Sequence, residues 1–456
     1  MCFQRPVKLN MTKARSDGLY LMLFGCAAFL ALGFLIVTVG RAPLLDFRTA
    51  YYSGRCLLDS CDPYRELEIE RLYSREVPPP AVPDPNRIVV TRNIYLPSAF
   101  PMTLPFAWLP RLPALAIWLS VIAGSFALAC FAVWNVAASR APLLSAGLLS
   151  FCLVNSILLL NSANPAGFVV PFCVLAVLSF IYGRFVPLGI ACFAISLAFK
   201  PHDGGLIWLY LLLAGGLYRR RALQTLAVVA AFSVPALLWI MHIAPNWLHE
   251  FSANMSAYSG AGDMNDPRGL HGACMMTNLQ TVTSFFWNNP HTYNLVSYLV
   301  CVPLLVAWVY ITLRAKRSSA NTWFAFASIS AFSVLPIYHR QYDAKLILLA
   351  IPALAILWKR GDRLAWAALG VTATAFFFDG DFPWVIFLQI MNKLHLLDTG
   401  PYQSLGIVLA DFPVPLSLLA MSAFYLWIYA RSALGNQNFD ETENAEVVAG
   451  QAISAT

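Results

Sequence analysis

Charged side chains are scarce in this sequence. Asp, Glu, Lys and Arg make up 12% of its 456 residues, about half of the usual share in a soluble globular protein, whereas hydrophobic residues make up 59%. The net charge of +7 is spread over short polar segments, and no basic stripe of the kind that binds nucleic acid is visible. We therefore expect a membrane protein that has membrane lipids, but no nucleic acid, among its partners.

Motifs for metals and soluble cofactors are also missing. The chain contains no CxxC pair, no HExxH sequence, no Walker loop and no dinucleotide fingerprint. We therefore expect neither a metal site nor a cofactor. No internal repeat of about 20–50 residues is visible, so we expect one integral domain rather than an array of repeats.

Hydrophobic runs recur along the chain, and many are about 20 residues long, which is enough for a helix to cross a bilayer. They predict an all-α polytopic membrane protein with about twelve spans (11–13). The first run is too long for a signal peptide and lacks an A-x-A-like cleavage site, so we interpret it as an uncleaved helix. The expected spans are 19–39, 112–136, 142–160, 166–182, 185–199, 204–217, 222–242, 292–313, 321–336, 344–358, 364–378 and 412–430.

Lys and Arg are concentrated in alternate connections between these spans. The connections at Arg140, Arg184, 218–221, 314–317 and 359–363 are all basic and together contain one acidic residue. Because cytoplasmic loops carry the excess of Lys and Arg, the pattern predicts that these loops and both termini are cytoplasmic. This topology suits the cytoplasmic (inner) membrane of a bacterium.

Three regions follow from this topology. Residues 1–18 form a cytoplasmic N-terminal segment, and residues 19–430 form a single integral membrane domain. Residues 431–456 form a polar, acidic tail whose composition is typical of disorder.

The remaining connections form the predicted outer face, which is periplasmic or extracellular. They are the first outer loop 40–111, the large outer loop 243–291, the segment 379–411, and three short polar turns at 161–165, 200–205 and 338–343. Polar groups that gather on one face of a helix bundle usually line a cavity. Snorkelling and helix capping would explain single residues, but several polar connections on one face favour a site.

Asp46 follows the first span closely and is predicted to lie where lipid meets water. Partial desolvation there would raise the basicity of its carboxylate, which suits a general base acting on a hydroxyl group. The following residues are amphipathic at helical spacing and predict an interfacial helix, for which Asp46 could equally be the N-cap. Cys56 and Cys61, five residues apart, could form a disulfide or remain free thiols.

A series of short motifs runs through the outer connections. DFRTAYY begins at Asp46 and DPY at Asp62, and the Tyr/Pro-rich stretch YLPSAFPMTLPFAWLPRLP follows. Later turns read NSANP, FKPHDGG and YHRQYD. In this order the motifs resemble glycosyltransferase family 87, from Asp46 to about Leu357. The family often carries G-Q-x-N where this chain has Asn161-Ser162-Ala163-Asn164.

The resemblance implies a C-type glycosyltransferase fold and an activity. Members transfer a sugar, usually mannose, from a polyprenyl-phosphate donor to an acceptor hydroxyl on the outer face, with inversion and without a metal. The family's catalytic base, an Asp in the first outer loop, corresponds to Asp46, and an essential His near the phosphate corresponds to His339. The acceptor is a glycolipid or a glycan that the sequence does not identify.

Cations near the leaving phosphate would stabilise its developing charge. We expect Arg340, Lys200 and His202 to bind the donor phosphate. We expect Asp203 and Asp343 to orient His202, Lys345 or Arg340 as ion-pair partners. The expected contacts of the sugar or acceptor are Tyr51, Tyr52, Asn161, Asn164 and Tyr342.

Two other functions stay open at this stage. Arg268 and His271 in the large outer loop are compatible with an O-antigen polymerase or ligase, which also uses lipid-linked sugars. A solute or lipid transporter would instead place its charges near the membrane midplane on broken helices, whereas this chain places them at the ends of spans.

Overall fold

The protein is described here from a computed structural model. The structure describes residues 11–39, 43–77, 88–260, 263, 265–268, 276–383, 386, 389, 393 and 412–435. Most of the predicted N-terminal segment and acidic tail, and parts of both long outer loops, lie outside these residues. The described residues are predominantly helical, and their β-structure is limited to an isolated bridge between Met276 and Arg340. The prediction of an all-α protein is confirmed.

A helix occupies the place of each expected span, because apolar residues without strong breaks favour long helices. The bounds are α1 (Met11–Thr38), α5 (Arg111–Ala137), α6 (Pro142–Val154) with α7 (Leu158–Ser162), α8 (Ala166–Tyr182), α9 (Val186–Phe199), α10 (Pro201–Ala214), α11 (Gly216–Ile243), α15 (Pro290–Arg314), α16 (Ser319–Phe332), η2 (Ala344–Ala350) with α17 (Ile351–Trp358), α18 (Arg363–Phe378) and α21 (Pro413–Leu434).

Six of these helical stretches are long and apolar enough to cross a membrane by themselves. They are α1, α5, α6 with α7, α11, α15 and α21. Four further stretches, α8, α9, η2 with α17, and α18, are apolar but shorter. The helices therefore have the features of a multi-pass membrane protein, and the expected count of about twelve spans goes beyond the six that length and composition support.

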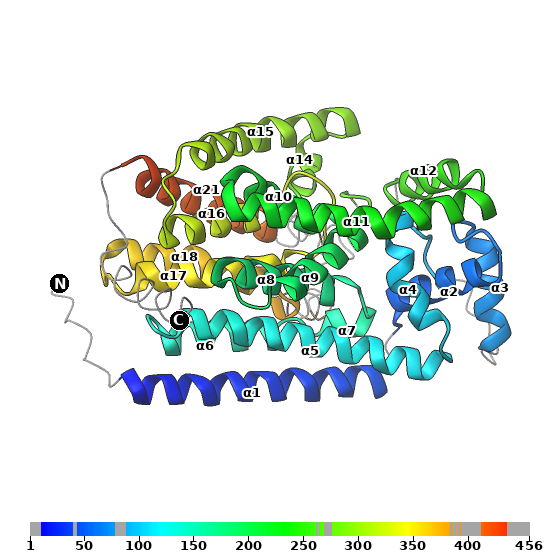
Figure 1. The fold of residues 1–456 in the computed structure, drawn as a ribbon, viewed down its shortest axis with the longest axis horizontal. Helices are drawn as coiled ribbons and strands as arrows, with labels where there is room; N and C mark the ends of the chain where they lie inside the picture. The colour runs from blue at the N-terminus through cyan, green and yellow to red at the C-terminus, as the bar shows by residue number, and fades with distance from the viewer. Residues whose placement is uncertain are drawn as a thin grey trace.

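A group of shorter helices gathers at one end of the bundle (Figure 1). It consists of α2 (Leu45–Leu58), α3 (Glu66–Glu76), η1 (Pro97–Ala99) with α4 (Phe100–Ala107), and α12 (Trp247–Tyr258). We call these helices the cap. The start of α1 and the last turns of α21 lie at the opposite end of the bundle (Figure 1). The remaining outer-loop helix, α14 (Leu279–Phe286), packs beside α15.

Two segments that are far apart in the sequence are joined inside the cap. The Asn254 side-chain amide on α12 donates hydrogen bonds to the carbonyls of Tyr64 (2.9 Å) and Asn93 (3.1 Å). Tyr64 is buried against Phe251 and Trp247 of the same helix. The large outer loop thus holds the first outer loop in place.

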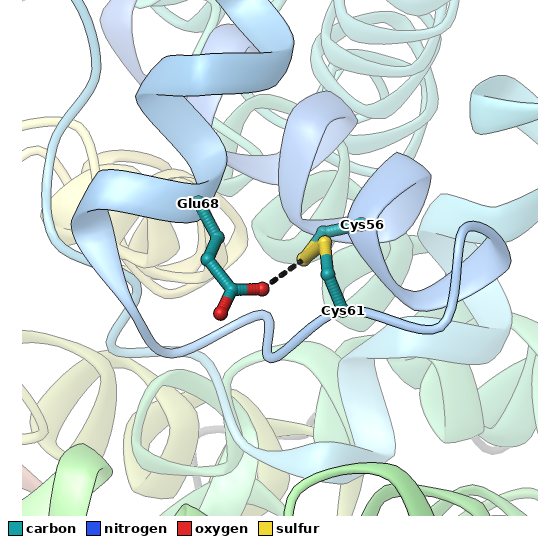
Figure 2. Close-up of side chains that lie close together, drawn as sticks. All are labelled: Cys56, Cys61 and Glu68. Carbon is teal, nitrogen blue, oxygen red and sulfur yellow. Dashed lines mark hydrogen bonds between the residues drawn. A yellow bond between two sulfur atoms is a disulfide. The ribbon is translucent and has the colours of Figure 1, made fainter.

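The turn that follows α2 is closed by a disulfide. Cys56 and Cys61 are bonded to each other, with their Cα atoms 4.9 Å apart, and Glu68 of α3 lies beside the bond (Figure 2). The Glu68 carboxylate accepts a hydrogen bond from the backbone N–H of Asp62 at 2.9 Å. Of the two states that the sequence left open for these cysteines, the structure has the disulfide, and it fixes the DPY segment relative to α2.

The centre of the bundle is formed by α16, whose residues from Ala320 to Phe332 are all buried. Elsewhere small residues allow close helix contact. A Cβ atom added at Gly25 of α1 would lie 2.6 Å from Cβ of Ser150 on α6, so the two backbones approach each other only because Gly25 has no side chain. This packing fixes the helix ends that carry the outer turns.

Candidate active site

A cavity of about 690 Å³ lies where the cap meets the ends of the bundle helices. Its wall combines the first outer loop with all three short polar turns predicted on the outer face. The first loop contributes Asp46, and the turns contribute Asn161 and Asn164, Lys200 and His202, and Arg340 and Tyr342. The structure therefore brings together residues that are separated by up to 296 positions in the chain, from Asp46 to Tyr342.

Asp46 lies in the first turn of α2, where the chain enters the cap. The preceding Leu44 has a left-handed backbone conformation (φ 50°), and its N–H donates to the carbonyl of Asn161 at 3.1 Å. A left-handed conformation is costly for a residue with a branched side chain and persists only where the surroundings impose it. This contact ties the start of α2 to the turn after α7 and aims Asp46 into the cavity.

The environment of Asp46 changes its acidity. Burial raises the pKa of Asp46 above its ordinary value, while a hydrogen bond from Asn164 and the positive charge of Lys200 oppose this shift. A carboxylate with a raised pKa is a stronger base when ionised. The sequence-based expectation of a desolvated Asp46 therefore agrees with its position.

A chain of polar contacts leads from Asp46 to the cations. Asn164 Oδ1 accepts a hydrogen bond from Lys200 Nζ at 3.2 Å, and Lys200 Nζ also donates to Asp343 Oδ1 at 2.6 Å. Asp343 Oδ2 in turn accepts the backbone N–H of Arg340 at 3.0 Å. Burial alone would lower the pKa of Lys200, but the carboxylates of Asp343, Asp203 and Asp46 together more than offset it, so the net shift is upward and the ammonium stays charged.

Arg340 presents its guanidinium on the cavity wall. Its side chain donates to the Tyr338 hydroxyl at 2.7 Å and to Asn265 Oδ1 at 2.8 Å, and both of these acceptors are neutral. Tyr342 lies nearby, with its ring 5.2 Å from Lys200 Nζ, in the range of a cation–π contact. Arg340 and Lys200 therefore place two positive charges beside two acidic side chains of the cavity wall, Asp46 and Asp343.

The two histidines predicted at this site take different positions. His202 lines the cavity, whereas His339 has no exposed surface and does not line the cavity formed by the described residues. Their Nε2 atoms lie 3.4 Å and 3.3 Å from Asp203 Oδ1. Burial alone would lower the pKa of His339, but the Asp203 carboxylate raises it overall. Asp203 thus contacts His202, one of the expected partners, and also His339, whereas the side chain that Asp343 contacts is Lys200.

Tyr51 and Tyr52, which we expected to contact the sugar, lie outside the cavity. Both are buried, and their hydroxyls donate to the Leu109 carbonyl (2.8 Å) and to Glu76 (2.9 Å). Their positions on α2 face the aromatic core of the cap rather than the face that carries Asp46. Helical periodicity explains the difference, since residues five and six positions after Asp46 point away from it.

Two further groups lie on the cavity wall. We expected Lys345 to pair with Asp203 or Asp343, but its buried Nζ contacts Asp379. Asp381 also lines the cavity and accepts the backbone N–H of Leu158 at 2.6 Å. Asp379 and Asp381 were not predicted, although both follow directly after an apolar span.

Comparison with known proteins adds no relative. No family model, no curated protein and no solved structure matches the chain. The resemblance to glycosyltransferase family 87 therefore rests on the motifs alone. The geometry itself offers a desolvated carboxylate, two cations and amide groups around one cavity, which together could activate a hydroxyl group and bind an anion.

Proposed function

We propose that this protein is a membrane glycosyltransferase that moves a sugar from a polyprenyl-phosphate donor to an acceptor hydroxyl. The observation that carries the proposal is the contact series from Asp46 through Asn164 to Lys200 and Asp343 at one cavity. It joins a basic group to phosphate-binding cations supplied by distant segments. The motif order that resembles glycosyltransferase family 87, and the C-type fold which that order implies, support the same assignment.

In the proposed reaction, Asp46 removes the proton from the acceptor hydroxyl as its oxygen attacks the anomeric carbon of the donor. The bond between that carbon and the phosphate oxygen breaks, and polyprenyl phosphate leaves with the bonding electrons. A single displacement of this kind inverts the anomeric configuration. Arg340 and Lys200 stabilise the negative charge that develops on the phosphate, and Arg offers two parallel donors to its oxygens.

The cavity also suggests how the substrates are held. Asn161 and Tyr342 lie on its wall with hydrogen-bonding groups and a ring face for a sugar. The donor's polyprenyl chain would lie between apolar helices, with its phosphate at the level of the cap. Mannose is the sugar that the family resemblance favours, and a glycolipid or glycan is the acceptor.

The proposal includes a location for the reaction. The cap would face the outer side of a bacterial cytoplasmic membrane, and both termini would lie in the cytoplasm. The contacts at the opposite end of the bundle support this topology, because Arg317 donates to the Ala214 carbonyl and Arg15 to the Asn135 side chain. Each of these contacts joins a basic residue to a neighbouring helix.

A transfer assay tests the proposal. Purified protein in lipid vesicles is supplied with radiolabelled polyprenyl-phosphate mannose and a membrane extract of acceptors. We expect Asp46→Asn to lower the transfer rate by about 10²–10⁴-fold, the range for loss of a general base. The control is Asp59→Asn at the C-terminal end of the same helix, where the side chain is exposed.

Three results would contradict the proposal. Full activity of a normally expressed Asp46→Asn variant would remove Asp46 as the base. Movement of label across the vesicle membrane without covalent transfer would identify a transporter. Transfer that depends on Arg268, which is exposed and outside the described cavity, would favour the polymerase or ligase alternative. His271, the other residue behind that alternative, lies outside the described residues.

A further inference from the structure

Asp203 is a buried carboxylate without a hydrogen-bond donor among the described residues. It is 1% exposed, and neither of its oxygens has a hydrogen-bond partner. A buried carboxylate in this situation is costly unless a cation compensates it. Lys200, the nearest candidate in sequence, is hydrogen-bonded to Asp343 and Asn164 instead. The charge of Lys200 acts on Asp203 without a hydrogen bond between the two, so direct ligands of this carboxylate must be its other neighbours or a bound ion.

Those neighbours are two imidazole nitrogens that converge on one oxygen of Asp203. His202 Nε2 lies 3.4 Å and His339 Nε2 lies 3.3 Å from Oδ1. The three ligand atoms all lie within 4.8 Å of one another. His339 Nε2 is buried, and Asp203 Oδ1 is the polar atom recorded beside it.

The other ring nitrogen of His339, Nδ1, already has a hydrogen-bond partner. Nδ1 lies 3.0 Å from the carbonyl oxygen of Ile337, which can only accept, so Nδ1 carries the proton. In the neutral ring, Nε2 then presents a lone pair toward Asp203. This arrangement, with one ring nitrogen donating to a backbone carbonyl and the other free to coordinate, is the usual one for a metal-binding histidine.

The distances fit a tetrahedral ion. Zinc binds imidazole nitrogen and carboxylate oxygen at about 2.0–2.1 Å, which gives a separation of about 3.3 Å between neighbouring ligands of a tetrahedron. Two of the three ligand separations have this length. The third, between the histidines, is at most 4.8 Å, and His202, with 36% of its side chain exposed at the cavity, has room to close it.

We propose that His202, Asp203 and His339 bind one Zn²⁺ ion, with a fourth coordination position open to the cavity. The ion would neutralise Asp203 and offer a Lewis-acidic position to an oxygen ligand, such as water or a phosphate oxygen. This inference departs from the metal-free site that the sequence led us to expect, and it does not depend on the transfer reaction, because binding of the ion is measured by itself.

Metal binding to the purified full-length protein tests the inference. After treatment with a chelator, the protein in detergent is titrated with Co²⁺, whose visible absorption reports tetrahedral coordination, and Zn²⁺ is then added to displace it. We expect one equivalent of each ion. His202→Ala should weaken binding by at least about tenfold, because one of three ligands is lost. His249→Ala, which removes an exposed histidine of α12, is the matched control.

The outcomes are distinct. A tetrahedral cobalt spectrum that is lost in His202→Ala and retained in His249→Ala supports the site. The absence of a stoichiometric, Zn²⁺-displaceable spectrum, or equal binding by the parent and His202→Ala, overturns it and leaves a protonated His339 as the counter-charge of Asp203. His202 lies at the cavity wall, so we expect its replacement to leave folding intact, and a thermal unfolding curve of each variant verifies this.

Discussion

Two buried Lys–Asp pairs contribute a lysine each to the wall of the same cavity, and the pairs differ in what surrounds them. Lys200 contacts Asp343 at 2.6 Å, and Lys345 contacts Asp379 at 3.0 Å. In each pair both side chains are at least nine-tenths buried. By charge, burial and distance alone the two pairs are equivalent, so none of these properties tells which pair belongs to a functional site.

The residues around the two pairs distinguish one pair from the other. Lys200 extends the contact series through Asn164 to Asp46 and lies over the ring of Tyr342. Lys345 instead donates to both the carboxylate and the backbone carbonyl of Asp379. The first pair therefore contacts other groups of the cavity wall, whereas the second fastens the chain segment at Asp379. The comparison shows that a buried charge with a functional role is identified by its contacts with residues other than its counter-ion.

The segment held by the second pair is also held by Asn155. The Asn155 side-chain amide donates to the carbonyls of Phe376 (3.3 Å) and Phe377 (3.2 Å), and its oxygen accepts the backbone N–H of Phe382 at 2.7 Å. Asp381 then caps the start of α7. These contacts fasten the end of α18 to the break between α6 and α7, which carries the turn with Asn161.

The largest effect should come from breaking the second pair. Lys345→Met leaves the Asp379 carboxylate buried without its partner, and we expect the free energy of unfolding to fall by about 3–5 kcal/mol. Denaturant unfolding in detergent measures it. Lys345→Met combined with Asp379→Leu should recover most of the loss, because an apolar pair can replace a buried ion pair. No recovery would mean that Lys345 has a role other than holding Asp379.

A smaller effect, on catalysis rather than stability, should come from Arg340→Lys. The charge remains but the planar fork that matches a phosphate is lost, so we expect transfer of the labelled sugar to slow by about 10²-fold with little change in unfolding temperature. Arg360→Lys in a basic connection is the control. Equal rates of sugar transfer for the two variants would show that Arg340 does not stabilise the leaving phosphate.

The smallest effect concerns the pH dependence of stability. Burial raises the pKa of Asp381 to about 6, against the opposing effects of Lys345 and of backbone hydrogen bonds. A carboxyl group whose pKa is higher in the folded state stabilises that state fully below its unfolded pKa of about 3.9, and the contribution is lost as pH rises through 6. Asp381→Asn should therefore gain stability relative to the parent between pH 4 and about 7. The same pH dependence of the free energy of unfolding in the parent and in Asp381→Asn across that range would contradict the raised pKa of Asp381.

The sequence predicted the helices well and the site in part. Long apolar runs give helices because few alternatives compete with them, and the basic and polar connections separated the two ends of the bundle. Asp46, Asn164, Lys200 and Arg340 came together as expected because each belongs to a polar turn on one face. Tyr51 and Tyr52 did not join the site, because residues five and six positions after Asp46 on a helix point away from it.

Other features required three-dimensional information. The partner of Lys345 is Asp379 rather than the expected Asp203 or Asp343, and only the return of the chain after α18 explains this pairing. The convergence of His202 and His339 on Asp203 joins helix α10 to a turn more than 130 residues later, and no spacing motif encodes it. Pairings of this kind depend on the packing of helix ends rather than on local sequence.

The link between Asn254 and the carbonyl of Tyr64 spans 190 residues, and this separation determines the delay between the synthesis of the two partners. A ribosome that adds about 5–20 residues per second needs roughly 10–40 seconds to produce the second partner after the first. During that interval the first outer loop, including both cysteines, has been synthesised but lacks its contacts with α12. The disulfide between Cys56 and Cys61, which needs only its own short turn, can close early and keep the waiting segment near its final shape.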